Sequence, residues 1–176
     1  RGWLDVKLVP ERRNTVKVLL FLDVGGSMDP HVRVCEELFS AARAEFRHLD
    51  FYYFHNCPYE ALWKNTRRRH DDRTPTWTVL RTFDSTYRAI FVGDAAMSPF
   101  ELTHEGGSVE HWNEESGLTW LKRLASQFPK SAWINPAAEK HCSYSPTTGL
   151  IAETLGGRMF HMTLEGLDRA MRELSR

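Results

Sequence analysis

Cysteine is scarce in this chain. The 176 residues contain three cysteines, at Cys35, Cys57 and Cys142. No C-x-x-C pair occurs and the number is odd, so the pattern excludes a typical zinc-ribbon site and a disulfide framework. Scarce and unpaired cysteines favour a reducing compartment, and we predict a cytoplasmic protein.

An excess of one charge is also absent, as is any long apolar run. Lys plus Arg and Asp plus Glu both number 23, which gives a formal net charge of zero. No whole-molecule basic field therefore attracts nucleic acid or an anionic membrane. The longest aliphatic and aromatic run, 18–22, is far shorter than the roughly 20 residues that span a bilayer. We expect neither a nucleic-acid partner nor a membrane span.

The composition that remains is that of a folded domain. Hydrophobic residues make up 41% of the chain and charged residues 26%, which is typical of globular proteins. The length fits one core, so we predict a single domain over 1–176. Because the chain starts at Arg1 without an initiator Met, we expect it to be the C-terminal part of a longer protein.

Strand and helix patterns alternate along the sequence. Runs rich in apolar and aromatic residues predict strands at 16–22, 49–54, 87–92, 132–134 and 158–162. Helical spacing predicts helices at about 30–46, from the turn at 74–77 to about 83, and at 118–128 and 165–174. This alternation predicts an α/β fold with a mostly parallel, doubly wound central sheet and helices on both faces, in three layers. The long connection at 93–117 is typical of a functional loop.

Two aspartates follow predicted strands directly. Asp23 ends the first strand and precedes Gly25, Gly26 and Ser27, and Asp94 ends the third. Ligands of open parallel sheets bind beyond the carboxyl ends of the strands, so these side chains are candidates for a site. Carboxylates and hydroxyls are oxygen ligands that suit Mg²⁺, Mn²⁺ or Ca²⁺.

A family resemblance rests on these residues. The motif Asp23-Val-Gly-Gly-Ser-Met28 between a strand and a helix, with the later Gly93-Asp94, resembles the von Willebrand factor A (VWA) domain. The stretches Phe91-Val-Gly-Asp-Ala-Ala-Met-Ser-Pro-Phe-Glu-Leu102 and Gly106-Gly-Ser-Val-Glu-His-Trp112 are similar to its bacterial CoxE-like branch. The resemblance covers nearly the whole chain and implies a Rossmann-like fold with a metal-ion-dependent adhesion site, or MIDAS.

The resemblance also implies which residues would bind the cation. Asp23, Ser27 and Asp94 match three motif positions, and either Thr76 or Thr74 matches the threonine of the second loop. Gly25 stands where the family has a middle serine, so either a water replaces that ligand or the site has lost its metal.

The expected partner-binding surface lies around this motif. It includes Gly25 and Asp29 beside the motif and Glu105 and His111 in the long loop. Asp29 is equally well placed to favour the N-terminus of the following helix.

The resemblance implies a non-enzymatic protein-interaction module that binds an acidic group of a protein partner. It further implies association with a MoxR-type AAA+ ATPase. The alternative is a Mg²⁺-dependent phosphohydrolase of the haloacid-dehalogenase type, with Asp23 as nucleophile and Asp94 as metal ligand. That family has a second aspartate two residues after the first, where this chain has Gly25, and no later catalytic lysine is evident.

Overall fold

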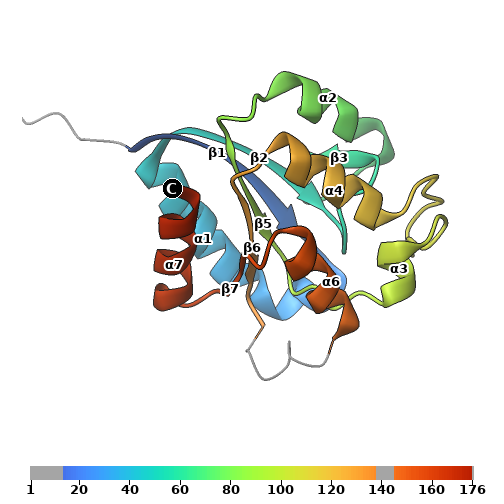
Figure 1. Ribbon diagram of the computed structural model, residues 1–176. Helices are drawn as coiled ribbons and strands as arrows, with labels where there is room; N and C mark the ends of the chain where they lie inside the picture. The colour runs from blue at the N-terminus through green and yellow to red at the C-terminus, as the bar shows by residue number, and fades with distance from the viewer. Residues whose placement is uncertain (1–13, 138–144, 176) are drawn as a thin grey trace, which may run out of the picture.

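Strands and helices alternate along the chain in the computed structural model, which describes residues 14–137 and 145–175 (Figure 1). The strands are β1 (Asn14–Asp23), β2 (Phe46–Phe54), β3 (Ala61–Trp63), β4 (Arg73–Pro75), β5 (Arg88–Val92), β6 (Ser131–Asn135) and β7 (Met159–His161). They form one sheet in the order β4-β3-β2-β1-β5-β6-β7. The predicted α/β fold with a mostly parallel sheet is therefore confirmed.

β1 lies in the interior of this sheet because its side chains are apolar on both faces. It pairs in parallel with β2 on one side and with β5 on the other, so that Leu20 lies between Phe51 and Ile90. Leu20 and Phe21 point to opposite faces and are both buried. A continuous apolar run without alternation is typical of a strand whose side chains are buried on both faces.

One edge of the sheet departs from the parallel pattern. β2 pairs with β3, and β3 with β4, in antiparallel orientation. Each of these two edge strands has three residues, and their sequences show no extended alternation. The sequence analysis predicted neither of them.

Helices occupy most connections between the strands. The α-helices are α1 (Val32–Glu45), α2 (Thr76–Thr82), α3 (Pro99–Thr103), α4 (Gly117–Gln127), α6 (Pro146–Thr154) and α7 (Leu164–Ser175), and 3₁₀ turns are η1 (Gly26–His31) and η2 (His70–Asp72). Side-chain caps fix two of the starts: Ser98 forms a capping box with Glu101, and Ser116 accepts a hydrogen bond from the Thr119 backbone. α6 and the short α3 were not predicted.

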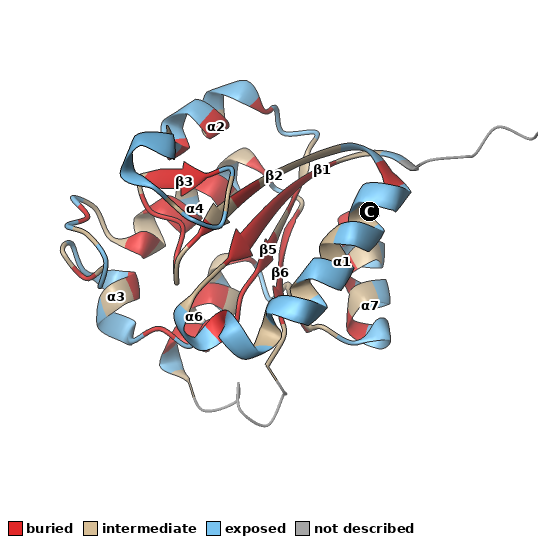
Figure 2. Cartoon of the chain, turned by 180° about the vertical axis from the view of Figure 1, so that it is seen from behind, coloured by how far each residue is buried: buried red, intermediate tan, exposed pale blue. Residues whose placement is uncertain are grey.

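Two clusters of buried side chains hold the helices against the strands. One contains stacked rings of Phe21, Phe91 and Trp133, whose successive centroids are 4.8 Å and 5.7 Å apart, and includes side chains of α2, α4 and α6. The other contains Leu20 and residues of α1 and α7. Figure 2 shows buried residues concentrated along the strands and exposed residues on the outer sides of the helices.

The helix at 30–46 was predicted too long at both ends. A 3₁₀ turn, η1, precedes α1, and Phe46 begins β2 rather than ending the helix. Within the described residues, no helix combines the length and the apolar character needed to cross a bilayer.

The order of the strands determines where a ligand could bind. From β1 the chain continues to β2 on one side of it, whereas β5, on the other side, continues to β6. The connections that follow β1 and β5 therefore diverge, which creates a crevice at the carboxyl ends of these two strands. Asp23 and Asp94 are the residues found there.

Candidate functional site

Asp23 and Asp94 lie at neighbouring strand ends. Asp23 is the last residue of β1, and Gly93 and Asp94 follow directly after β5, its parallel neighbour. Gly93 permits this proximity, because a Cβ there would lie 3.0 Å from the Cβ of Asp23 and 3.1 Å from its Oδ2. Both aspartates are buried, with 3% and 8% of their surface exposed. The structure thus brings two predicted site residues together.

The carboxylate of Asp23 is only half satisfied. Its Oδ1 accepts a hydrogen bond of 2.8 Å from the Asn56 backbone, whereas Oδ2 is buried and has no hydrogen-bond partner among the described residues. Burial raises the pKa of Asp23 to about 8, and Asp94 adds to this rise; the Asn56 hydrogen bond, the nearby Val24 N–H and the charge of Arg68 oppose it. A buried carboxylate with a free oxygen beside a second carboxylate would be stabilised by a bound cation.

Asp94 is positioned by its backbone neighbours. Its Oδ1 accepts a 3.0 Å hydrogen bond from the Ala96 N–H, and its carbonyl oxygen accepts one of 2.8 Å from Asn135 Nδ2 at the end of β6. The next residue, Ala95, has a positive φ of 55°, and its carbonyl lies 3.5 Å from the hydroxyl of Thr148 in α6. The turn that presents Asp94 is therefore held by β6 and α6.

The glycine turn after Asp23 has a conformation that other residues rarely adopt. Gly25 has φ 88° and ψ 171°. A Cβ at this position would meet Arg68 Nη2 at 3.4 Å and His55 Nδ1 at 3.6 Å. The position that was compared with the middle serine of a VWA motif is thus bordered by a guanidinium and an imidazole. Ser27, the next predicted ligand, lies exposed in η1.

The two candidate threonines of the second loop lie elsewhere in the sheet. Thr74 belongs to β4, and Thr76 begins α2 directly after it. β3 and β2 separate β4 from β1, a distance of roughly 14 Å at ordinary strand spacing. The buried Thr76 hydroxyl donates a 2.5 Å hydrogen bond to the Tyr59 carbonyl. Neither Thr74 nor Thr76 is therefore brought beside Asp23. A different threonine, Thr66, lines a small cavity of about 100 Å³ together with Asp23.

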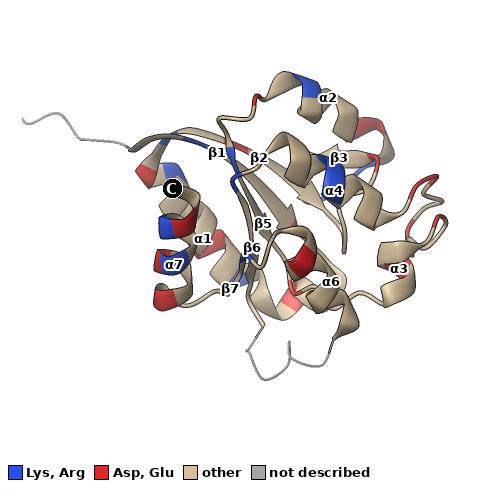
Figure 3. Cartoon of the chain, in the orientation of Figure 1, with Lys and Arg blue, Asp and Glu red and all other residues tan. Residues whose placement is uncertain are grey.

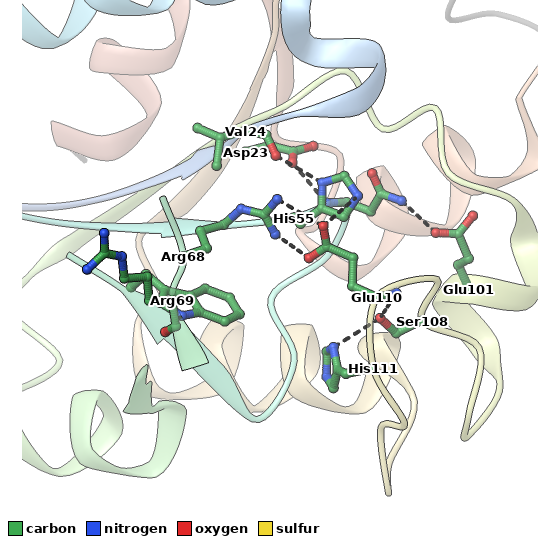
Figure 4. A network of polar contacts seen from close by, with 11 residues as sticks. Asp23, Val24, His55, Arg68, Arg69, Glu101, Ser108, Glu110 and His111 are labelled. Atoms are coloured by element: carbon green, nitrogen blue, oxygen red, sulfur yellow. Dashed lines mark hydrogen bonds and ion pairs between the residues drawn. The ribbon is translucent and has the colours of Figure 1, made fainter. Parts of the chain in front are cut away.

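His55, Arg68 and Glu110 form a polar cluster (Figure 4), and two of them, Arg68 and His55, lie next to Gly25 of the glycine turn. Arg68 binds Glu110 through both terminal nitrogens, with a distance of 2.9 Å between Nη2 and Oε1. His55 Nδ1 donates to the Val24 carbonyl at 2.9 Å, and its Nε2 lies 3.7 Å from Glu110 Oε1. We call these three residues the Arg68 cluster.

Electrostatics in this cluster favour the ionised form of Glu110. Partial burial opposes its ionisation, but the hydrogen bonds from Arg68 and the nearby His55, Arg68 and His111 outweigh that effect and lower the pKa of Glu110. The cluster therefore places a carboxylate against a guanidinium and an imidazole beside the crevice.

A second network connects the long loop to Asp23. Asn56, whose backbone binds Asp23, donates from Nδ2 to Glu101 Oε2 at 2.6 Å, and Glu101 completes the capping box of α3 (Figure 4). Asn56 adopts a left-handed conformation with φ 59°. The loop after β5 is thereby tied to the end of β2.

The remaining predicted partner-binding residues occupy different settings. Asp29 and Glu105 are exposed. His111 lies over the edge of the Tyr59 ring, with Nε2 3.1 Å from Glu60 Oε1 and Nδ1 3.2 Å from Ser108 Oγ. His111 thus belongs to the lining next to the Arg68 cluster, and Glu105 is not among the residues of that lining.

Several residues at this site were missed by the sequence analysis. His55 and Asn56 follow a correctly predicted strand, so the rule that identified Asp23 and Asp94 could also have found them. Arg68 lies in a basic run that is offset by acidic neighbours, and its pairing with a residue 42 positions away leaves no local signal.

The residues at the crevice fit a divalent cation in part. Asp23 Oδ2 and the Asp94 carboxylate supply the hard oxygen ligands that Mg²⁺, Mn²⁺ and Ca²⁺ prefer. Gly25 supplies no side-chain ligand. Over residues 14–137 and 145–175, no group of three or more His, Cys, Asp or Glu side chains is arranged to hold a metal ion. A cation here would depend on two carboxylates and water.

Comparison with family models, curated proteins and solved structures finds no match to this chain.

Proposed function

We propose that this chain is a non-enzymatic interaction module with the three-layer, doubly wound VWA fold of the CoxE-like branch. In this proposal, the crevice at the ends of β1 and β5 binds an acidic group of a protein partner. Asp23 and Asp94 would hold a divalent cation there. The strand order and the diverging connections after β1 and β5 support the choice of this crevice.

One observation carries the proposal: the unpaired Oδ2 of Asp23 next to a second buried carboxylate. Proteins rarely leave a buried carboxylate oxygen without a partner, because the loss of hydration is costly. Asp94 adds a like charge and so increases that cost. A bound cation would explain this arrangement, because it would bind the free oxygen of Asp23 and balance the negative charge of the two carboxylates.

When bound, a divalent ion would neutralise the two carboxylates and retain an open position for an incoming Asp or Glu. The chain's own residues would place the ligands: Gly93 gives Asp23 the room to face β5, and the Asn56 N–H orients Oδ1. Acidic and basic residues are interspersed along the elements drawn in Figure 3, which supports a protein partner rather than nucleic acid.

The cellular setting is proposed from the sequence resemblance alone. A MoxR-type AAA+ ATPase is the kind of partner that CoxE-like proteins suggest, and the unpaired cysteines favour the cytoplasm. Cys35 and Cys57 are free thiols, which is compatible with this setting.

The proposal is tested by thermal unfolding in EDTA and then in millimolar Mg²⁺, Mn²⁺ or Ca²⁺. The quantity compared is the cation-induced change in Tm, because removal of a buried carboxylate also changes the Tm of the cation-free protein. We expect a rise in the wild type that is lost in Asp23→Ala and Asp94→Ala and kept in the control Asp29→Ala, whose side chain is exposed. A change of Tm that is the same in all four proteins would refute the cation site.

The same preparations distinguish the haloacid-dehalogenase alternative. We expect no hydrolysis of p-nitrophenyl phosphate in Mg²⁺. Turnover that disappears in Asp23→Asn would instead establish a phosphohydrolase with Asp23 as nucleophile.

A further inference from the structure

Arg68 is held in place before any partner arrives. Its backbone has a left-handed φ of 47°, and 16% of its side chain is exposed. The guanidinium lies over the Trp63 ring, 5.8 Å from the centroid, and its Nε is buried with no hydrogen-bond partner in the described part of the chain. A fixed guanidinium loses little conformational entropy when it binds a carboxylate.

Glu110 binds this guanidinium from an exposed position. It lies in the loop between α3 and α4, and 38% of its side chain is exposed. Its neighbours Val109 and Trp112 are 68% and 71% exposed, which leaves apolar surface beside the carboxylate. Because the Glu110 carboxylate is accessible, an incoming carboxylate can approach it and take over the two terminal nitrogens, so that Arg68 stays paired throughout the exchange.

Space for another side chain adjoins the pair. A cavity of about 190 Å³ is bordered by Arg68 and Glu110 and by three further cationic or titratable side chains, His70, Arg73 and His111. Ala61 and Trp63 complete the lining. The cavity is several times the volume of one water molecule, and its basic groups favour an anion.

We infer that Arg68 and His55 form a carboxylate-binding site beside the crevice, that Glu110 occupies it in the free protein, and that an acidic side chain of a protein partner replaces Glu110. The inference rests on the proposed function. It assigns the binding of the partner's acidic side chain to Arg68 and His55, and it identifies Glu110 as the internal competitor for that site. Val109 and Trp112, carried on the same loop, would contact the apolar neighbours of the incoming residue.

The acidic surroundings favour a single carboxylate over a polyphosphate. Glu60 lies beside His111, and Glu101 binds Asn56 close to the cluster. These charges would repel the concentrated negative charge of a polyphosphate, whereas a single carboxylate of a peptide fits the two terminal nitrogens of Arg68 as Glu110 does.

The test uses calorimetric titration of the full chain with hexaglutamate at low salt in EDTA. EDTA removes any crevice cation, so this result does not depend on the metal part of the proposed function. Glu110→Gln releases Arg68 with little change of shape, and Glu114→Gln, an exposed glutamate of the same loop, is the charge-matched control. We expect hexaglutamate to bind Glu110→Gln about ten-fold more tightly than the wild type or Glu114→Gln.

Three further variants locate the binding site. In the Glu110→Gln background, Arg68→Gln should abolish the gain, Arg68→Lys should lose most of it, and Arg67→Gln should keep it. Circular dichroism verifies that each variant is folded. Equal affinities for Glu110→Gln and Glu114→Gln would overturn the inference, as would a gain that survives Arg68→Lys and Arg68→Gln. Binding of hexaglutamine, or tighter binding of inorganic phosphate, would also overturn it.

Discussion

The backbone N–H of Asn56 donates a 2.8 Å hydrogen bond to Asp23 Oδ1, and so joins the end of β2 to the end of β1. The same residue binds Glu101 through its side chain. Asn56 therefore connects the buried carboxylate of the crevice to the loop that carries Glu110. Its left-handed backbone makes this double role sensitive to substitution.

Asn56→Ala should destabilise the fold by about 2–3 kcal/mol. The substitution removes the hydrogen bond to Glu101. It also leaves φ at 59°, a conformation that asparagine tolerates through its short polar side chain and alanine does not. Asn56→Gly loses the same hydrogen bond but tolerates the backbone, so it should cost about 1 kcal/mol less. Urea unfolding measures the free energy of unfolding of both variants. Equal losses in the two variants would show that the left-handed backbone does not contribute to the cost of Asn56→Ala.

The pH dependence of stability should change in Asp23→Asn. Because the pKa of Asp23 is raised to about 8 in the folded protein, the folded state binds more protons than the unfolded state. The contribution of Asp23 is complete below its unfolded pKa and is lost as the pH rises through about 8. In EDTA, the free energy of unfolding of Asp23→Asn relative to wild type should rise by up to about 1.4 kcal/mol per pH unit between pH 5 and 7.5. A difference that stays constant over this range would contradict the raised pKa.

Gly93→Ala should damage the crevice and the fold together. The new Cβ would lie 3.0 Å from the Asp23 Cβ and 3.1 Å from both Asp23 Oδ2 and Trp133 Cζ2, so buried groups must shift. Such overpacking costs about 1–3 kcal/mol. Gly149→Ala in α6 is the control, because its Cβ meets nothing within 4 Å and should stabilise the helix slightly. Differential scanning calorimetry should give Tm changes of opposite sign.

Gly25→Ser recreates the middle serine of the family motif but should not improve cation binding. The φ of 88° is strained for serine, and the Cβ would be within 3.4–3.6 Å of Arg68 and His55. We expect a loss of about 1–3 kcal/mol in stability and no larger cation-induced rise in Tm than in wild type. A larger rise with retained stability would show that the turn readily adopts another conformation.

The central part of the fold was predictable because its signals are local. The run at 18–22 is apolar without alternation, and the β1 side chains on both faces are accordingly buried. β3 and β4 have three residues each, too few for periodicity to distinguish them from a loop. The nine residues of α6 begin with Pro146-Thr-Thr-Gly, which resembles a turn more than a helix.

The candidate site was predictable only where chemistry and strand ends coincide. Asp23 and Asp94 are acidic residues that directly follow apolar runs, so their proximity depends on sheet order alone. Thr74 and Thr76 were placed by motif likeness, but the antiparallel edge puts two strands between them and Asp23. The pairing of Arg68 with Glu110 depends on two loops whose paths no local pattern encodes.

Mn²⁺ binding measured by electron paramagnetic resonance tests the central claim most directly, because free Mn²⁺ gives a signal that is lost when the ion binds. We predict roughly one Mn²⁺ per chain at pH 8.5 in ~1 mM Mn²⁺, and weaker binding at pH 6, where protons compete for Asp23. Asp23→Asn and Asp94→Asn should each abolish binding, whereas Asp29→Asn should not. A full free-ion signal with the wild type at pH 8.5, or unchanged binding in the Asp23 and Asp94 variants, would contradict a cation site at the ends of β1 and β5.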